Sequence, residues 1–300
     1  MKILVVGGTG LIGGHAALYL KERGHDITLM ARKPSDVPGL AELPFIQGNY
    51  IEDDCSDGRL AGFDTLLFAA AVDIRQFPQD GSVTPEDFYT RGNTEGVPRF
   101  FEAAKAAGIS RAVYVGSFYP QVAPERIDVC PYVKSRHLAD EGVRALADEQ
   151  FTVCSVNAPF VLGRLEGLAI PHLDAMVAYA RGQLADMPVF APEGGTNHIT
   201  VDSLSPALAG ALEFGESGKA YLVGDENYSW KDYLELWFRL ADNEQDIPVG
   251  QEDHPLLPNV IMFAGPGATV SYEPDEAETA LLGYPRQLVA STVREILAHS

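Results

Sequence analysis

Basic side chains are scarce in this sequence. Its 300 residues include 22 Lys and Arg against 42 Asp and Glu, which gives a formal net charge of −20. A surface of that sign repels the phosphates of nucleic acids and the headgroups of anionic lipids. We therefore expect neither nucleic acid nor a membrane among the partners.

The shortage of basic residues is greatest in the second half of the chain. Residues 1–150 carry 15 basic and 21 acidic side chains, whereas residues 151–300 carry 7 and 21. We expect the first half to bind any anionic ligand. The second half is suited to a substrate with little negative charge.

Cysteines and long hydrophobic runs are also scarce. Cys55, Cys130 and Cys154 lie far apart and form no Cys-x-x-Cys pair, which argues against a disulfide framework and a cysteine-based zinc site. The seven histidines show no His-Glu-x-x-His spacing, so no metal is predicted. No apolar run reaches the roughly 18 residues of a membrane span, and the N-terminus lacks signal-peptide features. A cytoplasmic protein is expected.

The sequence does contain an alternation of short apolar runs and helical stretches. Residues 11–23 and 97–107 show helical spacing of apolar residues, and a glycine follows each stretch. Strands separated by helices predict right-handed βαβ crossovers and a parallel sheet covered on both faces. This predicts an α/β fold of the doubly wound, Rossmann type, with strands at 3–6, 27–30, 45–47, 65–70, 112–115 and 152–156.

The rhythm of the sequence changes after Pro159. Helical stretches at 171–182, 203–214 and 229–241 alternate with a Pro-Glu-Gly-Gly turn and a short strand at 220–223. We predict a dinucleotide-binding domain over 1–160, to which 196–215 returns. A smaller, partly interleaved α/β domain over 161–300 would bind the substrate.

Three glycines follow the first strand at Gly-x-x-Gly-x-x-Gly spacing. Gly7 allows a tight turn, Gly10 lets backbone amides approach a pyrophosphate, and Gly13 permits close packing of the helix that follows. Glycines also occur in ordinary turns between strands and helices. Within a βαβ unit of this length, however, the spacing indicates a nucleotide-binding site.

The second strand ends in Ala31-Arg32-Lys33, where NAD-binding proteins usually place a carboxylate for the ribose hydroxyls. A small residue followed by two cations would neutralise a 2′-phosphate. The sequence therefore favours NADP(H) over NAD(H). The alternative is that Arg32 and Lys33 are solvated loop charges.

Several further motifs occur in order at the expected spacing, and together the sequence resembles the extended short-chain dehydrogenase/reductase superfamily. The resemblance is to the NAD-dependent epimerase/dehydratase type, which includes dihydroflavonol reductase-like and 3β-hydroxysteroid dehydrogenase-like enzymes. It covers nearly the whole chain. The matching motifs are the glycine turn, Gly48-Asn49, Ala69-Ala70-Ala71, Asn93-x-x-Gly96, Tyr114-Val-Gly-Ser117, Tyr132-Val-Lys-Ser-Arg136, Asn157-Ala-Pro159 and Leu282-Gly-Tyr-Pro285.

The resemblance implies a set of cofactor-binding positions. Some belong to the glycine turn and the others follow successive strands or lie in the catalytic motif. Together with Arg32 and Lys33, which the end of the second strand already indicates, they are Gly7, Thr9, Gly10, Leu11, Ile12, Gly13, Asn49, Ala69, Ala70, Ala71, Asn93, Tyr132, Arg136 and Pro159.

The resemblance also implies catalytic roles. Tyr132 would pass a proton to or from a substrate oxygen, Ser117 would orient that oxygen, and hydride would move to or from the nicotinamide. The family places a Lys four residues after the tyrosine, but Arg136 stands there. Arg136 would hold the ribose and favour the phenolate, although its planar fork does not imitate an ammonium. Lys134 cannot replace the missing Lys, because two residues turn a helix by about 200°.

Two other polar residues have competing interpretations. Asn93 is expected near the nicotinamide, yet an Asn before a helix is more often an N-cap, and both can be true. His198 could contact a polar substrate, but a surface or structural histidine is the more common case. Phe118, Tyr119, Phe160 and Leu162 are expected to form a largely apolar wall. The aromatic residues between Tyr228 and Phe238 are expected to form a core face.

The expected function is an NADP(H)-dependent oxidoreductase that interconverts a carbonyl and a secondary alcohol on a neutral, apolar or aromatic small molecule. One alternative is a nucleotide-sugar epimerase or dehydratase, although its pyrophosphate-bearing substrate asks for cations in the second half. The other is a non-catalytic NADP(H)-binding regulator, which the change to Arg136 keeps open. The resemblance further implies a homodimer through residues 98–107 and 135–146.

Overall fold

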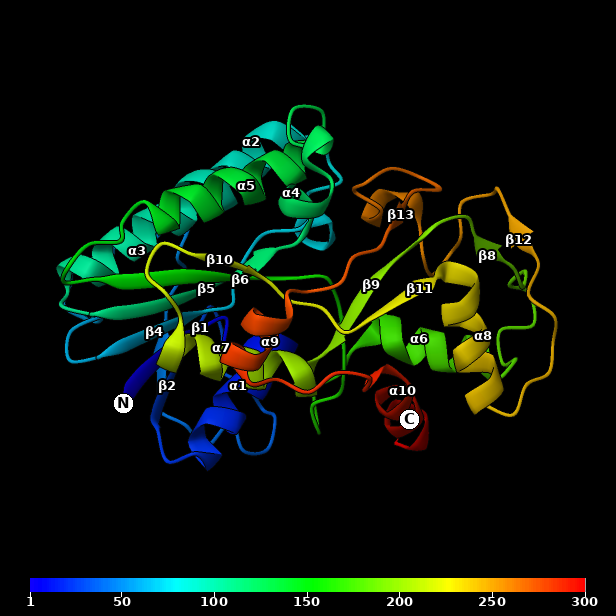
Figure 1. Ribbon diagram of the computed structural model, residues 1–300, viewed down its shortest axis with the longest axis horizontal. Helices are drawn as coiled ribbons and strands as arrows, with labels where there is room; N and C mark the ends of the chain where they lie inside the picture. The colour runs from blue at the N-terminus through cyan, green and yellow to red at the C-terminus, as the bar shows by residue number, and fades with distance from the viewer. Residues whose placement is uncertain (300) are drawn as a thin grey trace.

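A seven-stranded sheet forms the centre of the first half of the chain. The structure is a computed structural model that describes residues 1–299, and the strand order is β10-β6-β5-β4-β1-β2-β3 (Figure 1). All neighbouring strands run parallel, which confirms the predicted doubly wound α/β fold. The strands are β1 (Lys2–Val6), β2 (Asp26–Ala31), β3 (Phe45–Gln47), β4 (Thr65–Phe68), β5 (Arg111–Ser117), β6 (Thr152–Ala158) and β10 (Ala220–Leu222).

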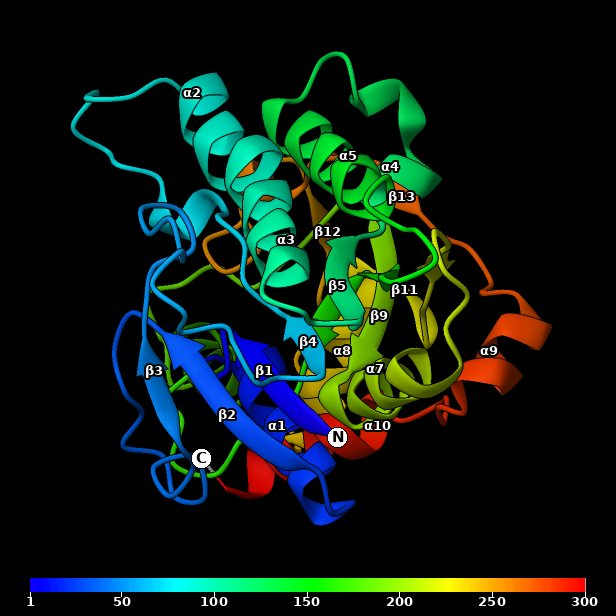
Figure 2. The same cartoon turned by 90° about the vertical axis from the view of Figure 1, so that its left-hand side faces the viewer.

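Helices cover both faces of this sheet, as the view in Figure 2 shows. On one face lie α1 (Leu11–Glu22) and α7 (Val201–Phe214), and on the other lie α3 (Gly96–Ala106) and α5 (Pro131–Arg144). Successive residues of β1 serve the two cores in turn, because side chains of a strand alternate between faces. Ile3 and Val5 pack toward α1, whereas Leu4 and Val6 pack toward α3.

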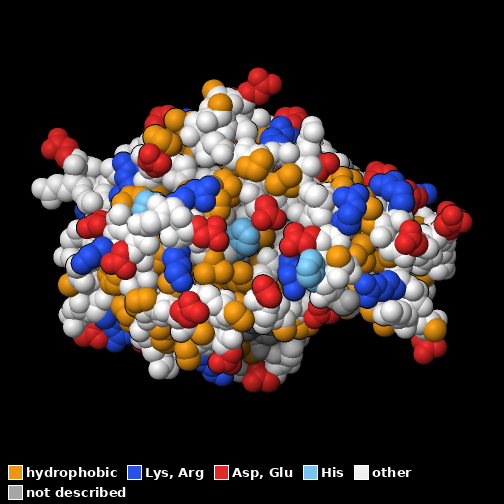
Figure 3. Space-filling model, turned by 90° about the horizontal axis from the view of Figure 1, so that it is seen from below, with side chains coloured by type: hydrophobic (Ala, Val, Ile, Leu, Met, Phe, Trp, Pro, Cys, Tyr) orange, Lys and Arg blue, Asp and Glu red, His pale blue; other side chains and the backbone are white. Residues whose placement is uncertain are grey.

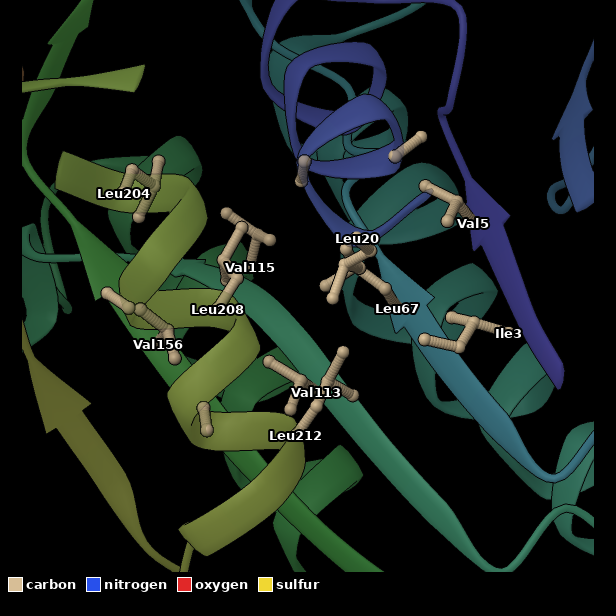
Figure 4. Packing of buried hydrophobic residues seen from close by; sticks show 14 of the residues in the cluster. Ile3, Val5, Leu20, Leu67, Val113, Val115, Val156, Leu204, Leu208 and Leu212 are labelled. Carbon is tan, nitrogen blue, oxygen red and sulfur yellow. The ribbon is translucent and has the colours of Figure 1, made fainter. Parts of the chain in front are cut away.

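The core between the sheet and α7 shows helical spacing. Leu204, Leu208 and Leu212 recur every four residues and face the sheet, where Val113 and Val156 meet them (Figure 4). All five side chains are almost completely buried. This packing holds the strand ends, and with them the candidate site, in a rigid frame.

A smaller second unit is built around β9 (Gly195–Thr200). This strand pairs with β7 (Phe160–Leu162) and β13 (Thr269–Val270) in parallel, and with β11 (Glu226–Ser229) antiparallel. The helices α6 (Pro171–Ala180), α8 (Trp230–Leu240) and α10 (Val289–Ala298) contribute to a second core. Tyr233 and Trp237 of α8 are buried there, so this aromatic stretch is a core face as expected.

The two units exchange segments of chain. β9 belongs to the second sheet, and the chain then returns as α7 to the underside of the first. The predicted return covered residues 196–215. In the structure the return begins with α7, because β9 lies in the second sheet, and it continues beyond residue 215, because β10 pairs with β6 and forms the sheet edge. Further along the chain, α9 (Glu276–Leu282) places Leu282 in the same core as α7. A three-residue strand such as β10 does not reveal its sheet by sequence alone, since pairing decides it.

Short elements complete the chain. They are η1 (Ile74–Gln76), α2 (Pro85–Tyr89), the π-helical η2 (Thr90–Glu95), α4 (Tyr119–Val122), η3 (Pro124–Arg126), β8 (Ala191–Pro192), β12 (Val249–Gly250) and η4 (Asn259–Ile261). Among residues 1–299 no helix has the length and apolar character to cross a membrane. On the face shown in Figure 3, Lys and Arg side chains lie scattered among Asp and Glu.

His198 lies in the second core and is a structural residue. Its ring stacks on Tyr233 at 4.4 Å, and its Nδ1 lies 3.2 Å from the carbonyl oxygen of Thr196. The side chain is fully buried, and this burial lowers its pKa to about 3. Desolvation disfavours the charged imidazolium, so the folded protein holds a neutral ring.

This buried imidazole makes stability depend on pH. Between about pH 3 and pH 6.5 the unfolded chain protonates His198 and the folded chain does not, so acid favours unfolding. In a His198→Gln variant, the free energy of unfolding should lose roughly 1.4 kcal/mol less per pH unit than in the wild type over this window. Denaturant titrations from pH 6.5 to 4.5 measure the difference. An exposed control, His299→Gln, should keep the wild-type slope. Equal slopes for the wild type and His198→Gln would contradict the assignment.

Candidate active site

The glycine turn joins β1 to α1 at the carboxyl edge of the sheet. Gly7 has φ +77°, and a Cβ there would lie 2.7 Å from the carbonyl oxygen of Ala69. A Cβ on Gly13 would lie 2.4 Å from the carbonyl oxygen of Gly7, so both positions exclude a side chain. At Gly10 the nearest atom to such a Cβ is 3.5 Å away, and this glycine is exposed. The backbone of the chain packs closely against Gly7 and Gly13, whereas the space beside Gly10 leaves room for a ligand.

The start of α1 fits a dinucleotide pyrophosphate. Gly10 is the N-cap residue and supplies no side chain to the helix, and Leu11 and Ile12 begin the helix as partly buried residues. First-turn amides have no partner within a helix, and the helix dipole adds a partial positive charge there. Thr9 is partly exposed beside Gly10. The residues present therefore suit the anionic centre of the predicted cofactor.

The predicted adenosine-binding residues lie on neighbouring strand ends. Arg32 and Lys33 are exposed and follow β2, and β2 pairs with β3, after which Asn49 stands. Within residues 1–299 neither cation takes part in a salt bridge. Asn49 is held in a turn, where its backbone N–H donates to the Asp53 carboxylate at 3.0 Å. Arg32, Lys33 and Asn49 therefore lie together at the carboxyl ends of β2 and β3.

Hydrogen bonds hold the stretch 69–71 beside the glycine turn, and Asn93 holds the residue that follows it. Ala69 donates its N–H to the carbonyl of Val6 at 2.8 Å, so this stretch runs directly beside the glycine turn. Asn93 is fully buried in η2; its side chain accepts from the Val72 N–H and donates to the Val72 carbonyl and to Ser135 Oγ. The N-cap interpretation of Asn93 is wrong, because Glu95 is the N-cap residue of α3. Asn93 instead fixes the chain after Ala71 to α5.

Tyr132 and Arg136 lie one turn apart on α5 and face the end of β5. The Arg136 Nη1 lies 3.5 Å from the Tyr132 hydroxyl, and its Nη2 donates to the Val115 carbonyl at 2.8 Å. Ser117 closes the same strand and is 7% exposed. Lys134 points elsewhere and pairs with Glu86 at 3.0 Å. The Ser117 hydroxyl at the end of β5 and the Tyr132 phenol with the Arg136 cation on α5 therefore lie at the carboxyl edge of the sheet.

The charge on Arg136 is buried among phenols. No carboxylate of residues 1–299 forms an ion pair with Arg136, and its guanidinium lies 5.5 Å from the Tyr114 ring centre and 5.9 Å from that of Tyr132. Burial works against the cation, but Tyr114, Tyr132 and Tyr50 together raise the pKa of Arg136 above its usual range. Burial also raises the pKa of Tyr114 and Tyr50. A permanent buried cation beside the Tyr132 oxygen would stabilise negative charge on that oxygen.

The segment after β6 lies beside the segment after β5. The Phe118 N–H donates to the Ala158 carbonyl at 3.3 Å, and buried Pro159 follows at once. Asn157 donates its side-chain amide to Gln121 at 2.7 Å. Pro159 is therefore placed at the same edge as Ser117.

The predicted apolar wall divides in the structure. Phe118 and Tyr119 pack together at 4.2 Å beside the site, whereas Phe160 and Leu162 of β7 pack with the second core. A residue that the sequence analysis missed completes the wall. Phe263 stacks on Tyr132 with ring centres 3.9 Å apart. No motif marked Phe263, because it lies in a loop far along the chain.

The model of the NAD dependent epimerase/dehydratase family matches residues 3–224 of this chain. Among curated proteins, a 3-beta-hydroxysteroid dehydrogenase of Mycolicibacterium neoaurum is 31% identical over 39% of this chain and 32% of its own length. The chain therefore matches about a third of the length of that relative. A 3-diazoavenalumate denitrifying reductase of Streptomyces sp is 28% identical over 75% of this chain and 77% of its own. UDP-glucose 4-epimerases are also among the relatives.

Solved structures share the architecture. The crystal structure of gox2253 aligns with a TM-score of 0.78 at 23% identity, over 99% of this chain and 96% of the other. At that identity the likeness concerns the fold. It shows that both units, and not only the sheet of the first, occur together in another protein.

Proposed function

Because this chain belongs to the NAD dependent epimerase/dehydratase family, within the extended short-chain dehydrogenases/reductases, we propose a specific reaction for it. It is an NADP(H)-dependent oxidoreductase that interconverts a carbonyl and a secondary alcohol on a neutral, apolar or aromatic small molecule. The observation that carries this proposal is the Tyr132 hydroxyl beside the buried Arg136 guanidinium, at the edge where Ser117 ends β5.

The three side chains have distinct tasks in this proposal. A nicotinamide cofactor, when bound, would supply or accept the hydride. Tyr132 gives its hydroxyl proton to the substrate oxygen during reduction and takes it back during oxidation. Ser117 donates a hydrogen bond that orients the same oxygen. Arg136 keeps a positive charge beside Tyr132, so that the phenolate left after proton transfer is not an isolated buried anion.

The second half of the chain offers little to a nucleotide-sugar. Residues 151–299 contain seven basic side chains, and three of them are already paired with carboxylates: Lys219 with Glu216 and Glu278, Lys231 with Glu235, and Arg286 with Glu273. The wall beside Tyr132 consists of aromatic rings. A neutral substrate suits these surroundings better than a pyrophosphate.

The preference for NADP(H) rests on Arg32 and Lys33. Both cations are exposed next to Asn49 and free to pair with a 2′-phosphate. An Arg32→Ala, Lys33→Ala double variant should lose about 10- to 100-fold in kcat/KM for NADPH and little for NADH, since charge-assisted hydrogen bonds contribute at this level. Steady-state kinetics with both cofactors measures the ratio. The control Lys231→Ala, on α8, should leave it unchanged. A wild type that prefers NADH would overturn the assignment.

A carbonyl panel tests the reaction itself. Purified protein with NADPH should oxidise the cofactor in the presence of at least one neutral ketone or aldehyde. Conversion of a UDP-sugar without net cofactor oxidation would indicate an epimerase. Tight cofactor binding with no turnover of either class would indicate a regulator.

A further inference from the structure

The ring of Tyr132 is held between two other aromatic rings. Phe263 stacks on it with centres 3.9 Å apart and planes 20° apart, and Tyr89 of α2 meets it edge-on at 5.4 Å. Tyr132 is 9% exposed as a result. Phe263 covers one face of the ring, Tyr89 makes an edge-to-face contact with it, and Arg136 lies at its hydroxyl.

Phe263 belongs to the loop between η4 and β13, and this loop is anchored. Arg126 of η3 donates from Nε to the Phe263 carbonyl at 3.0 Å. Inside the loop the Gly265 N–H donates to the Met262 carbonyl at 2.8 Å. At its end the Ala268 carbonyl accepts from the Gly195 N–H at 3.1 Å. Phe263 is thus a fixed contribution of the second unit to the site in the first.

Phe263 continues the wall that begins directly after Ser117. Tyr119 meets Phe263 edge-on at 5.7 Å, and Phe118 packs against Tyr119. Phe263 itself is only partly buried. A substrate whose oxygen meets Tyr132 and Ser117 therefore has aromatic rings beside the rest of its body.

We propose that Phe263 is a specificity-determining residue that selects carbonyl compounds in which the carbonyl is attached to an aromatic ring. This inference rests on the proposed function. Aromatic rings gain from stacked and edge-to-face contacts with one another beyond what burial of an apolar group provides. A flat ring also fits against the wall, whereas a puckered ring of similar size does not pack as closely.

Two methyl ketones that differ mainly in aromaticity test this proposal. Acetophenone carries a flat phenyl ring, and 1-cyclohexylethanone carries a puckered saturated ring of the same number of carbons. The wild type should prefer acetophenone in kcat/KM. In Phe263→Leu this preference should fall about tenfold or more, mainly through KM for acetophenone, and Phe263→Tyr should retain it because the ring remains.

A matched control is Phe77→Leu. Phe77 stands at the far end of the same run of rings, against Phe88, and two rings, Phe88 and Tyr89, separate it from Tyr132 in that run. Its substitution should leave the preference unchanged. If Phe263→Leu changes both ketones by the same factor, or if the wild type reduces both equally, the role of Phe263 is overturned and the proposed function stands.

A binding measurement separates failure of the two proposals. If the wild type reduces neither ketone nor any other carbonyl, the proposed reaction fails. Fluorescence titration with 2-acetylnaphthalene in the presence of NADP then tests Phe263 alone. Binding that weakens about tenfold in Phe263→Leu but not in Phe77→Leu supports the aromatic wall. Binding that is absent, or equal in all three proteins, overturns it.

Discussion

Replacing Tyr132 with phenylalanine should lower kcat by roughly a thousandfold or more, since positioned proton transfer contributes on this scale. The change removes the hydroxyl that faces Arg136 and keeps the ring that stacks on Phe263. We therefore expect the folded structure and the dissociation constant for NADPH to change little. Kinetics with the best carbonyl substrate and calorimetric titration with NADPH measure the two quantities.

The matched control for Tyr132 is Tyr233→Phe. Tyr233 is also a buried tyrosine stacked on another ring, but it lies in the second core against His198. Its loss of a hydroxyl should leave kcat within a few-fold of the wild type. Full activity in Tyr132→Phe would mean that the proton comes from another group.

Replacing Arg136 with methionine should lower kcat between about tenfold and a thousandfold. The change removes the buried cation beside the Tyr132 oxygen, and loss of one preorganised group that stabilises developing charge costs on this scale. Stability should respond differently. Arg136 is buried and pairs with no carboxylate of residues 1–299, so its removal relieves desolvation while it leaves the Val115 carbonyl without that donor. We expect the free energy of unfolding to stay within about 2 kcal/mol of the wild type.

The Arg136→Lys variant separates charge from shape. The lysine ammonium keeps the charge, but its single nitrogen cannot reproduce the two contacts that the guanidinium nitrogens of Arg136 make with Tyr132 and Val115. We expect activity above that of the methionine variant and below that of the wild type. A lysine variant faster than the wild type would mean that Arg136 handicaps the site and that the two contacts do not support catalysis.

The sheet could be predicted from the sequence because its strands are buried on both faces. Such strands appear as apolar runs, and the glycine turn marks where the first one ends. The placement of β10 in this sheet could not be predicted, because three residues carry too little pattern to show which sheet they join. The cap interpretation of Asn93 is wrong because its partners, Val72 and Ser135, come from other segments. Hydrogen bonds between distant segments leave no spacing in the sequence.

The same contrast holds within the candidate site. Tyr132 and Arg136 are four residues apart on one helix, so helical geometry alone places them together. The same geometry turned Lys134 away, and it is found with Glu86. Phe263 reaches Tyr132 only through the path of the loop after η4. Its position depends on the packing of the second unit against the first, which no local pattern encodes.

Transfer of a labelled hydride tests the central claim most directly. NADPH carrying deuterium at the transferable position of nicotinamide C4 is incubated with the protein and with neutral ketones and aldehydes, and the products are analysed by mass spectrometry. The proposed reaction predicts a product alcohol with one deuterium on the carbinol carbon, formed by the wild type and not at a comparable rate by Tyr132→Phe. If no carbonyl compound acquires deuterium while the protein binds NADPH, the proposed oxidoreductase activity is contradicted.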